Sequence, residues 1–311
     1  MANHAQQLAD FVHGTRFEQL PPEVVDYTKL IILDSLICGI AAGPMERSRM
    51  MHAVVDPLGG PPEASVFGLK RRLPALYAVM ANAEIMNLLD ADDTLFSSNH
   101  FAVFNVAAGL AEAQRLGRSG KDLIRSVAVG FDINTRLNLG LLLMDEVDGK
   151  FQWASMAGMG FAAFGTAASA AAAVRLDREQ TRNLFGLVGW LAPTAVTNDM
   201  ATRREFETMK YANYAGAAHA GMLATRLADQ GYTGDQECLD RKPGFMGAQG
   251  GLRTDYDLMV SELAQKWWVL ETSIKYYPSC RYTHGPIDML RRLMFSPFSW
   301  FTSLKNRITL S

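Results

Sequence analysis

The sequence is poor in the residues that hold small secreted domains and structural metal modules together. It has three cysteines and six histidines among 311 residues, and they are scattered along the chain. An odd number of widely spaced cysteines indicates reduced thiols in an intracellular protein rather than a disulfide framework. These residues are also too few and too dispersed for a structural zinc module. We therefore expect no metal and a cytoplasmic location.

Neither sign of charge is in excess. The chain has 30 basic and 32 acidic residues, which gives a formal net charge of −2. Nucleic acids and anionic membrane surfaces attract proteins with a basic field, so neither is expected as the main partner. The first 18 residues lack a basic stretch followed by an apolar one, so they predict no signal peptide.

Long runs of large apolar side chains are also missing. Residues 151–174 are uncharged and long enough to cross a bilayer, but they consist mainly of Ala, Gly, Ser and Thr. Small side chains contribute little to transfer into lipid and allow close helix packing. This stretch therefore predicts a tightly packed internal helix rather than a transmembrane one.

Four common catalytic or cofactor motifs are absent. The sequence has no Gly-x-Gly-x-x-Gly after a strand and no Gly-x4-Gly-Lys-Ser/Thr, which excludes dinucleotide-binding and P-loop sites. It also lacks His-Glu-x-x-His and Gly-x-Ser-x-Gly, so neither a zinc protease nor a hydrolase nucleophile elbow is supported. We expect no cofactor.

What the sequence does have is a helical hydrophobic pattern. After Pro21-Pro22, apolar residues recur three and four positions apart until Gly43-Pro44, which predicts a helix between these breaks. Further helices are expected at about 75–89, 101–116, 119–140, 152–174, 178–191 and 208–230. A capping pair at Ser119 and Asp122 supports one of these boundaries.

The segments between the helices are short and polar. Residues 56–74 form a looser segment in which 64–68 is expected to be extended, and residues 90–99 are expected to form a loop. Asp177 is expected to cap the helix after the alanine tract, and Gly231 to follow the last one. Long period-2 alternation, internal repeats and a Pro/Ser-rich linker are absent, so the chain is expected to form one all-α body.

Three polar segments stand out against this background. The first is the loop 90–100, which holds Asp90, Asp92, Asp93, Thr94 and His100 between two apolar helices. Its composition fits a solvated helix-capping loop. It also fits a proton-transfer or polar substrate site at a helix N-terminus, where the helix dipole favours an anionic ligand.

The other two segments contribute cations. Lys210 stands where a helix rich in Ala and Gly begins, and a cation there gains nothing from the helix dipole. It is either solvated or placed to bind an anion. Lys275, Arg281 and His284 surround a turn at Pro278, where they form either a surface cluster or a clamp for a carboxylate.

In this order, the three segments resemble the MmgE/PrpD family, which includes 2-methylcitrate dehydratase, cis-aconitate decarboxylase and iminodisuccinate epimerase. The similarity extends from about Ala5 to about Leu293. It also includes Leu33-Asp34-Ser35, Val129-Gly130-Phe131-Asp132-(x)3-Arg136, Gly231-Tyr-Thr-Gly234 and Pro243-Gly244-Phe245. The resemblance implies a large all-helical domain with a smaller α+β lid, usually in a homodimer.

The resemblance also implies a pocket for a small polycarboxylate. The family's Asp-x-x-Asp-Thr…His-Pro loop matches Asp90, Asp93, Thr94 and His100, although Phe101 replaces the proline. Its lysine before the small-residue helix matches Lys210. Its Lys-x-x-Pro-x-Cys/His turn matches Lys275, Pro278 and Cys280, and His284 lies just beyond.

Two departures from the family pattern bear on activity. Relatives often carry a histidine before the small-residue helix, whereas this chain has Met156 in a stretch without histidine. The tail 294–311 does not resemble the family lid, so we expect a helical domain at 1–293 followed by an atypical tail, with the lid missing or truncated.

Together these features predict a lyase of the 2-methylcitrate dehydratase type that removes a proton next to a carboxylate. His100 is the expected base, oriented by Asp90, while Lys210 and Lys275 are expected to stabilise the developing charge. Asp93, Thr94, Cys280 and His284 are expected to contact the substrate. The alternatives are an epimerase of a small amino- or imino-dicarboxylate and a non-catalytic helical homodimer.

Overall fold

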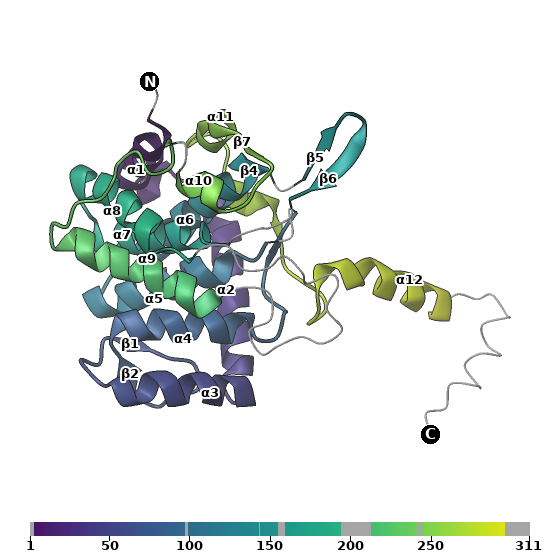
Figure 1. The fold of residues 1–311 in the computed structure, drawn as a ribbon. Coiled ribbons are helices and arrows are strands. Elements are labelled where there is room, and N and C mark those ends of the chain that lie inside the picture. Colours follow the sequence, from purple (N-terminus) through teal and green to yellow (C-terminus); the bar gives the residue numbers. More distant parts are fainter. Residues whose placement is uncertain are drawn as a thin grey trace.

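The computed structural model describes residues 3–96, 99–142, 144–154, 159–193, 213–241 and 244–295, and these form a layered stack of helices (Figure 1). The α-helices are α1 (His4–Gly14), α2 (Pro22–Ala42), α3 (Glu46–Val55), α4 (Ala75–Asn87), α5 (Ala102–Leu116), α6 (Gly120–Gly140), α7 (Ala162–Val174), α8 (Arg178–Leu191), α9 (Tyr214–Asp229), α10 (Phe245–Ala248), α11 (Tyr256–Val260) and α12 (His284–Phe295). The mostly helical body agrees with the all-α expectation.

Strands in the described residues occur only as short antiparallel pairs. They are β1 (Ala64–Ser65) with β2 (Arg72–Leu73), β3 (Thr94–Leu95) with β8 (Thr272–Ser273), β4 (Leu141–Leu142) with β7 (Arg253–Thr254), and β5 (Met144–Val147) with β6 (Lys150–Trp153). The β3–β8 pair joins segments that are far apart in the chain, with Thr94 opposite Ser273. It therefore brings the polar loop 90–100 next to the segment that carries Lys275.

Local signals set several helix boundaries. The Ser119 side chain accepts the Asp122 backbone N–H, and the Asp122 side chain accepts the Ser119 N–H, so the predicted capping box opens α6. Asp177 caps α8 in the same way with Gln180. Gly231 has φ of 85°, the left-handed conformation that suits the residue after a helix. All three predicted caps are confirmed.

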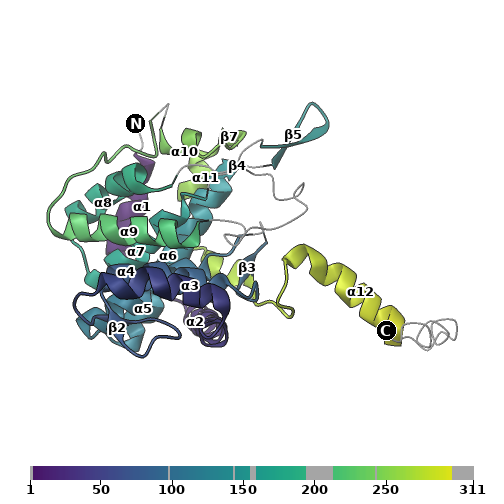
Figure 2. The same cartoon turned by 60° about the horizontal axis from the view of Figure 1, so that its bottom comes forward.

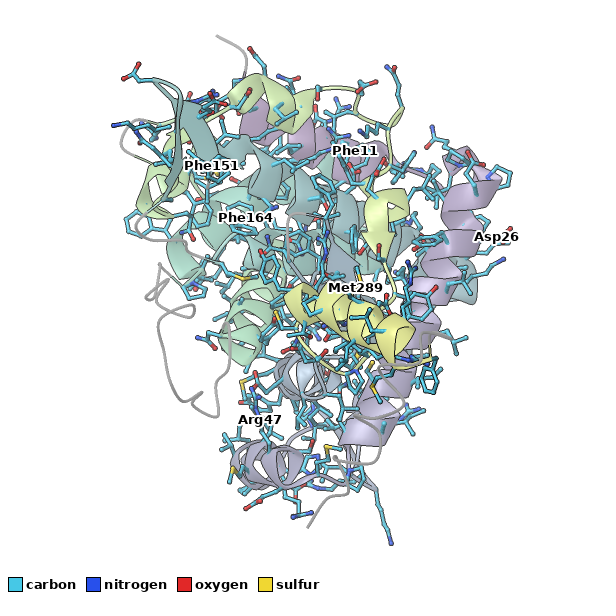
Figure 3. The ribbon with its side chains drawn as sticks, turned by 90° about the vertical axis from the view of Figure 1, so that its right-hand side faces the viewer. Phe11, Asp26, Arg47, Phe151, Phe164 and Met289 are labelled. Atoms are coloured by element: carbon cyan, nitrogen blue, oxygen red, sulfur yellow. The ribbon has the colours of Figure 1, made fainter. Side chains whose placement is uncertain are left out.

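The core is built around α7, whose small side chains let its neighbours approach closely. Helices α5, α6 and α9 all pack against it. A Cβ at Gly165 of α7 would clash with the Asn134 side chain of α6, and one at Gly130 of α6 would clash with Ser169 Oγ. Aromatic rings fill the remaining space, including Phe164, which Figure 3 shows inside the body. The alanine-rich stretch is therefore an internal helix, as predicted.

One helix prediction was wrong at its start. The structure places β6 at Lys150–Trp153 and begins α7 only at Ala162, whereas a helix was expected from residue 152. Asp148 and Gly149 both have positive φ and connect two paired strands, which is the geometry of a tight hairpin turn. The turn preference of Asp-Gly overrides the helical pattern there. Helices α1, α3, α10, α11 and α12 were not predicted.

Two features lie outside the packed body. Helix α12 has no buried residue and extends away from the other helices in both views (Figures 1 and 2). The β5–β6 hairpin also projects from the body. Among the described residues, no helix is both long and apolar enough to span a membrane. The tail beyond Phe295 lies outside the described residues, and the proposed boundary at 293/294 falls within α12.

Candidate active site

The loop before α5 brings three aspartates into the protein interior. Asp92 and Asp93 are fully buried, and Asp90 is 8% exposed. Asp90 has φ of 54°, a left-handed conformation that aspartate tolerates better than most residues. A solvated capping loop would leave these carboxylates in water, so burial favours the alternative of a built polar site.

Asp93 holds the start of α5 against strand β8. Its Oδ1 accepts the Ala102 backbone N–H at 3.0 Å, and its Oδ2 accepts the Thr272 hydroxyl at 3.0 Å. Burial, and then the neighbouring Asp92 charge, raise the pKa of Asp93 to about 8. Asp93 is therefore mostly a neutral acid at pH 7. Its two side-chain bonds connect parts of the chain that are distant in sequence.

His100 faces this loop from its other end. The ring is 8% exposed, and its Nδ1 lies 2.6 Å from the Asp93 carbonyl oxygen and 3.7 Å from Asp92 Oδ2. A carbonyl only accepts hydrogen bonds, so Nδ1 carries the proton and Nε2 is the basic nitrogen. Burial lowers the pKa of His100, against the opposing effect of Asp92. The imidazole is therefore neutral near pH 7.

Lys275 forms a buried ion pair with Asp90. Its Nζ lies 2.7 Å from Asp90 Oδ1, 2.6 Å from the Asp90 carbonyl oxygen and 3.4 Å from the Ser279 carbonyl oxygen. Three acceptors thus surround the three ammonium hydrogens, and the lysine side chain is only 1% exposed. Lys275 therefore lies against the 90–100 loop, as predicted, although Asp90 already balances the charge of the lysine.

The other predicted site residues lie at the edge of this cluster or outside the described residues. Thr94 is buried in β3, and its hydroxyl lies 3.4 Å from the Leu95 carbonyl oxygen. His284 Nε2 lies 3.3 Å from the Ser279 carbonyl oxygen that Lys275 also contacts, and Cys280 is half-buried in the same turn. Lys210 lies outside the described residues, as does Met156, which stands where relatives often have histidine.

Two buried polar groups near the cluster were not predicted as site residues. Within the described part of the chain, neither Asp34 Oδ2 of α2 nor the hydroxyl of Tyr214 in α9 has a hydrogen-bond partner. Burial, followed by the Asp92 charge, raises the pKa of Asp34 to about 6. The Tyr214 ring stacks on Phe104 at 5.0 Å, and its pKa is raised well above the ordinary value by burial and then by Asp92 and Asp90. The resemblance segment Leu33-Asp34-Ser35 includes Asp34, and Tyr214 belongs to the Lys210 segment that opens the helix rich in Ala and Gly.

A second buried ion pair fixes the segment that leads to Lys275. Asp132 and Arg136 lie one turn apart on α6, and both side chains are almost completely buried. Arg136 donates to the carbonyl oxygens of Ser261, Glu262 and Lys266, and Asp132 accepts the Trp268 backbone N–H at 3.1 Å. The Asp-(x)3-Arg pattern quoted in the resemblance therefore has a structural basis, because it anchors residues 261–268 just before β8.

A divalent cation would find candidate ligands in this cluster. Ligand atoms of Asp90, Asp92 and His100 all lie within 4.8 Å of one another. However, the Lys275 ammonium bonds Asp90, and the Asn87 amide donates to both carboxylate oxygens of Asp92, at 2.9 and 3.1 Å. A metal would have to displace both donors. The arrangement suits a polar organic ligand better than a metal ion.

Comparison with known proteins gives one consistent relationship. The model of the MmgE/PrpD N-terminal domain matches residues 6–253. Cis-aconitate decarboxylase of Mus musculus is 28% identical over 291 residues, which cover 91% of this chain and 57% of that protein. The Homo sapiens enzyme is 27% identical over 91% of this chain and 58% of its own length, and that of Aspergillus terreus is 24% identical over 94% and 60%. The chain thus spans about three fifths of the length of these curated relatives.

Proposed function

The chain belongs to the MmgE/PrpD family, and we propose that it is a lyase that acts on a small di- or tricarboxylate by proton transfer next to a carboxylate. The observation that carries this proposal is the buried cluster of Asp90, Asp92, Asp93 and His100, held together with Lys275 across 185 residues of sequence. Burial of so many titratable groups destabilises a fold, and such clusters are typical of functional sites.

In this proposal His100 is the proton-transfer residue. Its neutral ring and its Nδ1 bond to the Asp93 carbonyl leave Nε2 as a base near neutral pH. The nearby Asp92 carboxylate, at 3.7 Å, stabilises the imidazolium that forms when Nε2 takes a proton. In this proposal the Asp93 backbone carbonyl and Asp92 orient the ring together with Asp90.

The negative charge that develops on the substrate needs a cation. Lys275 is already surrounded by acceptors, so its part is to position Asp90 and the 275–279 turn. We assign direct charge stabilisation to Lys210, following the family pattern, and substrate contacts to Thr94, Cys280 and His284. We keep Asp93 beside the substrate as the family pattern implies, where its neutral carboxyl adds no negative charge next to a substrate carboxylate.

The relatives favour one reaction within the lyase class. All three relatives reported above are cis-aconitate decarboxylases, so decarboxylation of a tricarboxylate is the first activity to test. Dehydration of a 2-methylcitrate-like substrate and epimerisation of a small amino- or imino-dicarboxylate use the same first step of proton abstraction or its reverse. They remain the alternatives. We also propose a cytoplasmic location, in line with the few scattered cysteines.

The test is turnover of a substrate panel by the purified chain. Release of CO2 from cis-aconitate, and loss of water from 2-methylcitrate and citrate, are followed for the wild type and for His100→Ala and Lys210→Ala. We expect at least a tenfold loss of turnover in each variant, since a positioned base contributes about 10²–10⁴-fold and a charge-stabilising group about 10²–10³-fold. Lys70→Ala, at an exposed loop lysine, is the control for a lost positive charge.

If the wild type turns over none of these acids, the lyase proposal fails. The epimerase and the non-catalytic homodimer are then the remaining accounts. If both variants keep the wild-type rate, the chain has an activity but not at this cluster.

The dimer expectation also has a candidate surface. Leu30, Leu33, Ile37 and Ile40 lie three and four positions apart on α2 and are 49–68% exposed. Such a stripe on a surface helix is typical of a protein interface. We propose that two copies of the chain pack through α2, and that Ile37→Lys shifts the sedimentation coefficient from dimer to monomer. Wild type that sediments as a monomer would contradict this.

A further inference from the structure

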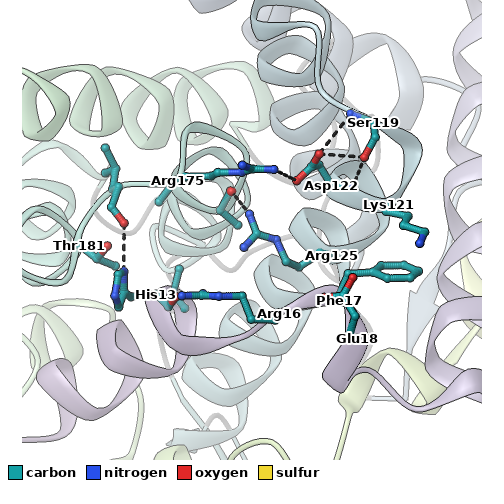
Figure 4. A pocket seen from close by; sticks show the side chains of 14 residues that line it. His13, Arg16, Phe17, Glu18, Ser119, Lys121, Asp122, Arg125, Arg175 and Thr181 are labelled. Carbon is teal, nitrogen blue, oxygen red and sulfur yellow. Dashed lines mark hydrogen bonds and ion pairs between the residues drawn. The ribbon is translucent and has the colours of Figure 1, made fainter.

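A cavity at the N-terminal end of α6 has a lining rich in basic residues. It has a volume of about 430 Å³, which lies in the size range of small-molecule sites. It opens between the end of α1, the start of α6 and the end of α7. Figure 4 shows Arg125 in the middle of its lining, with Arg175, Arg16 and Lys121 around it.

The charged groups of this cavity do not balance. Four cations, Arg16, Lys121, Arg125 and Arg175, face two carboxylates, those of Glu18 and Asp122, which leaves two positive charges in excess. The whole chain, by contrast, carries a net charge of −2. The cavity is therefore a local basic site on a slightly acidic protein.

One of the two carboxylates is already engaged. Asp122 Oδ1 accepts Arg175 Nη2 at 3.0 Å, and its Oδ2 accepts the hydroxyl and the backbone N–H of Ser119. This capping role holds Asp122 at the helix start and leaves Glu18 as the remaining anion for three cations.

Some of the cations also stabilise helix ends. Arg125 donates to the carbonyl oxygens of Thr15 and Ala172, and Arg16 donates to that of His13. These carbonyls lie at the ends of α1 and α7, where a positive charge is favourable. Lys121 differs from them, because it is exposed and lies over the Phe17 ring, 5.2 Å from the ring centre.

The hydrogen bonds of Arg125 to the helix ends use its Nη atoms and leave its Nε–H without an acceptor among the described residues. Arg125 is 7% exposed. Burial lowers the pKa of its guanidinium, and the charges of Arg175, Arg16 and Arg118 add to this effect against the opposing charge of Asp122. An anion from solution would stabilise this cluster of like charges.

We propose that this cavity is a second anion site, separate from the acidic cluster, and that it takes a small molecule with two or more phosphate or carboxylate groups. Arg16, Arg125 and Arg175 supply planar donors that match either kind of group. Lys121 adds a point charge on a flexible side chain at the open side, close to the positive end of α6. A single monovalent anion would neutralise only half of the excess charge.

The experiment is isothermal titration of the chain with pyrophosphate and, separately, with citrate, at constant ionic strength and with acetate as the monovalent reference. The variant is Lys121→Glu, and Lys70→Glu is its matched control, since both reverse one exposed lysine. An acidic residue in the first turn of α6 favours the helix dipole, so Lys121→Glu is expected to fold, as circular dichroism would verify.

We expect the wild type and Lys70→Glu to bind at least one of the two polyanions more tightly than acetate. Lys121→Glu should weaken that binding by about tenfold, as reversal of one charge contact implies. The relative strength of pyrophosphate and citrate identifies the class of ligand. If neither polyanion binds, or if the two lysine variants bind equally, the cavity is not an anion site. Citrate that binds without dependence on Lys121 occupies another place and counts against the proposal in the same way.

Discussion

The replacement Asp93→Asn tests the electrostatics of the buried cluster. Asparagine has the same shape, and its side-chain oxygen can still accept the Ala102 N–H that opens α5. The Thr272 hydroxyl, which donates to Asp93, can rotate and accept from the new amide group. The substitution therefore removes the titrating proton while it keeps the contacts that hold α5 and β8 together.

The expected effect is a weaker pH dependence of the free energy of unfolding. The pKa of Asp93 is raised to about 8 in the folded protein from an ordinary value of 3.8, so the folded state holds a proton that the unfolded chain releases. The stability this gives is complete below about pH 4 and is lost as the pH rises towards 8. A single retained proton changes the free energy by about 1.4 kcal/mol per pH unit, which amounts to about 2 kcal/mol between pH 6 and pH 8.

The assay is urea unfolding of the wild type and Asp93→Asn at pH 6, 7 and 8, followed by circular dichroism. Asp26→Asn is the control, because Asp26 lies exposed on α2 beside Lys29 and should retain the wild-type slope. Between pH 6 and pH 8 the free energy of unfolding of the wild type should fall by about 2 kcal/mol more than that of Asp93→Asn. Equal slopes for wild type and Asp93→Asn would refute the assignment of a neutral acid at this position.

Three further predictions concern the surroundings of the cluster. Arg136→Met leaves Asp132 buried without its partner and should lower the free energy of unfolding in urea by about 3–5 kcal/mol. The double variant with Asp132→Leu should recover part of this loss. Equal stability of the single and double variants would contradict the ion-pair account. Tyr214→Phe removes a hydroxyl that has no partner among the described residues, so stability should change by less than about 1 kcal/mol, whereas a larger loss would reveal a contact for that hydroxyl. Prolonged EDTA treatment should leave the melting temperature unchanged, because Lys275 and Asn87 already donate hydrogen bonds to the carboxylates of Asp90 and Asp92. A lower melting temperature that Mg²⁺ or Zn²⁺ reverses would establish a metal site.

The sequence predicted elements whose boundaries are set by local chemistry. The α6 and α8 starts follow from capping residues that act within one turn, and the Pro21-Pro22 start of α2 follows from the fixed proline φ. The predicted start of the 152–174 helix was wrong because the turn at Asp148 and Gly149 and the pairing of two strands outweigh the helical pattern there. Local patterns of composition do not report such pairing.

The site was only partly accessible from sequence. Nothing local places Lys275 beside Asp90, and the expectation that they meet came from the family resemblance. The buried polar groups of Asp34 and Tyr214 were missed because burial next to Asp92 is a product of tertiary packing. Whether Lys210 joins them stays a prediction, since it lies outside the described residues.

A crystal structure of the chain soaked with cis-aconitate tests the central claim most directly. The account predicts a ligand beside His100 Nε2, with its carboxylates within hydrogen-bond distance of Thr94 and of the Lys210 ammonium. A ligand bound only in the basic cavity around Arg125, or no ligand at saturating concentration, would contradict the assignment of the aspartate–histidine cluster as the substrate site.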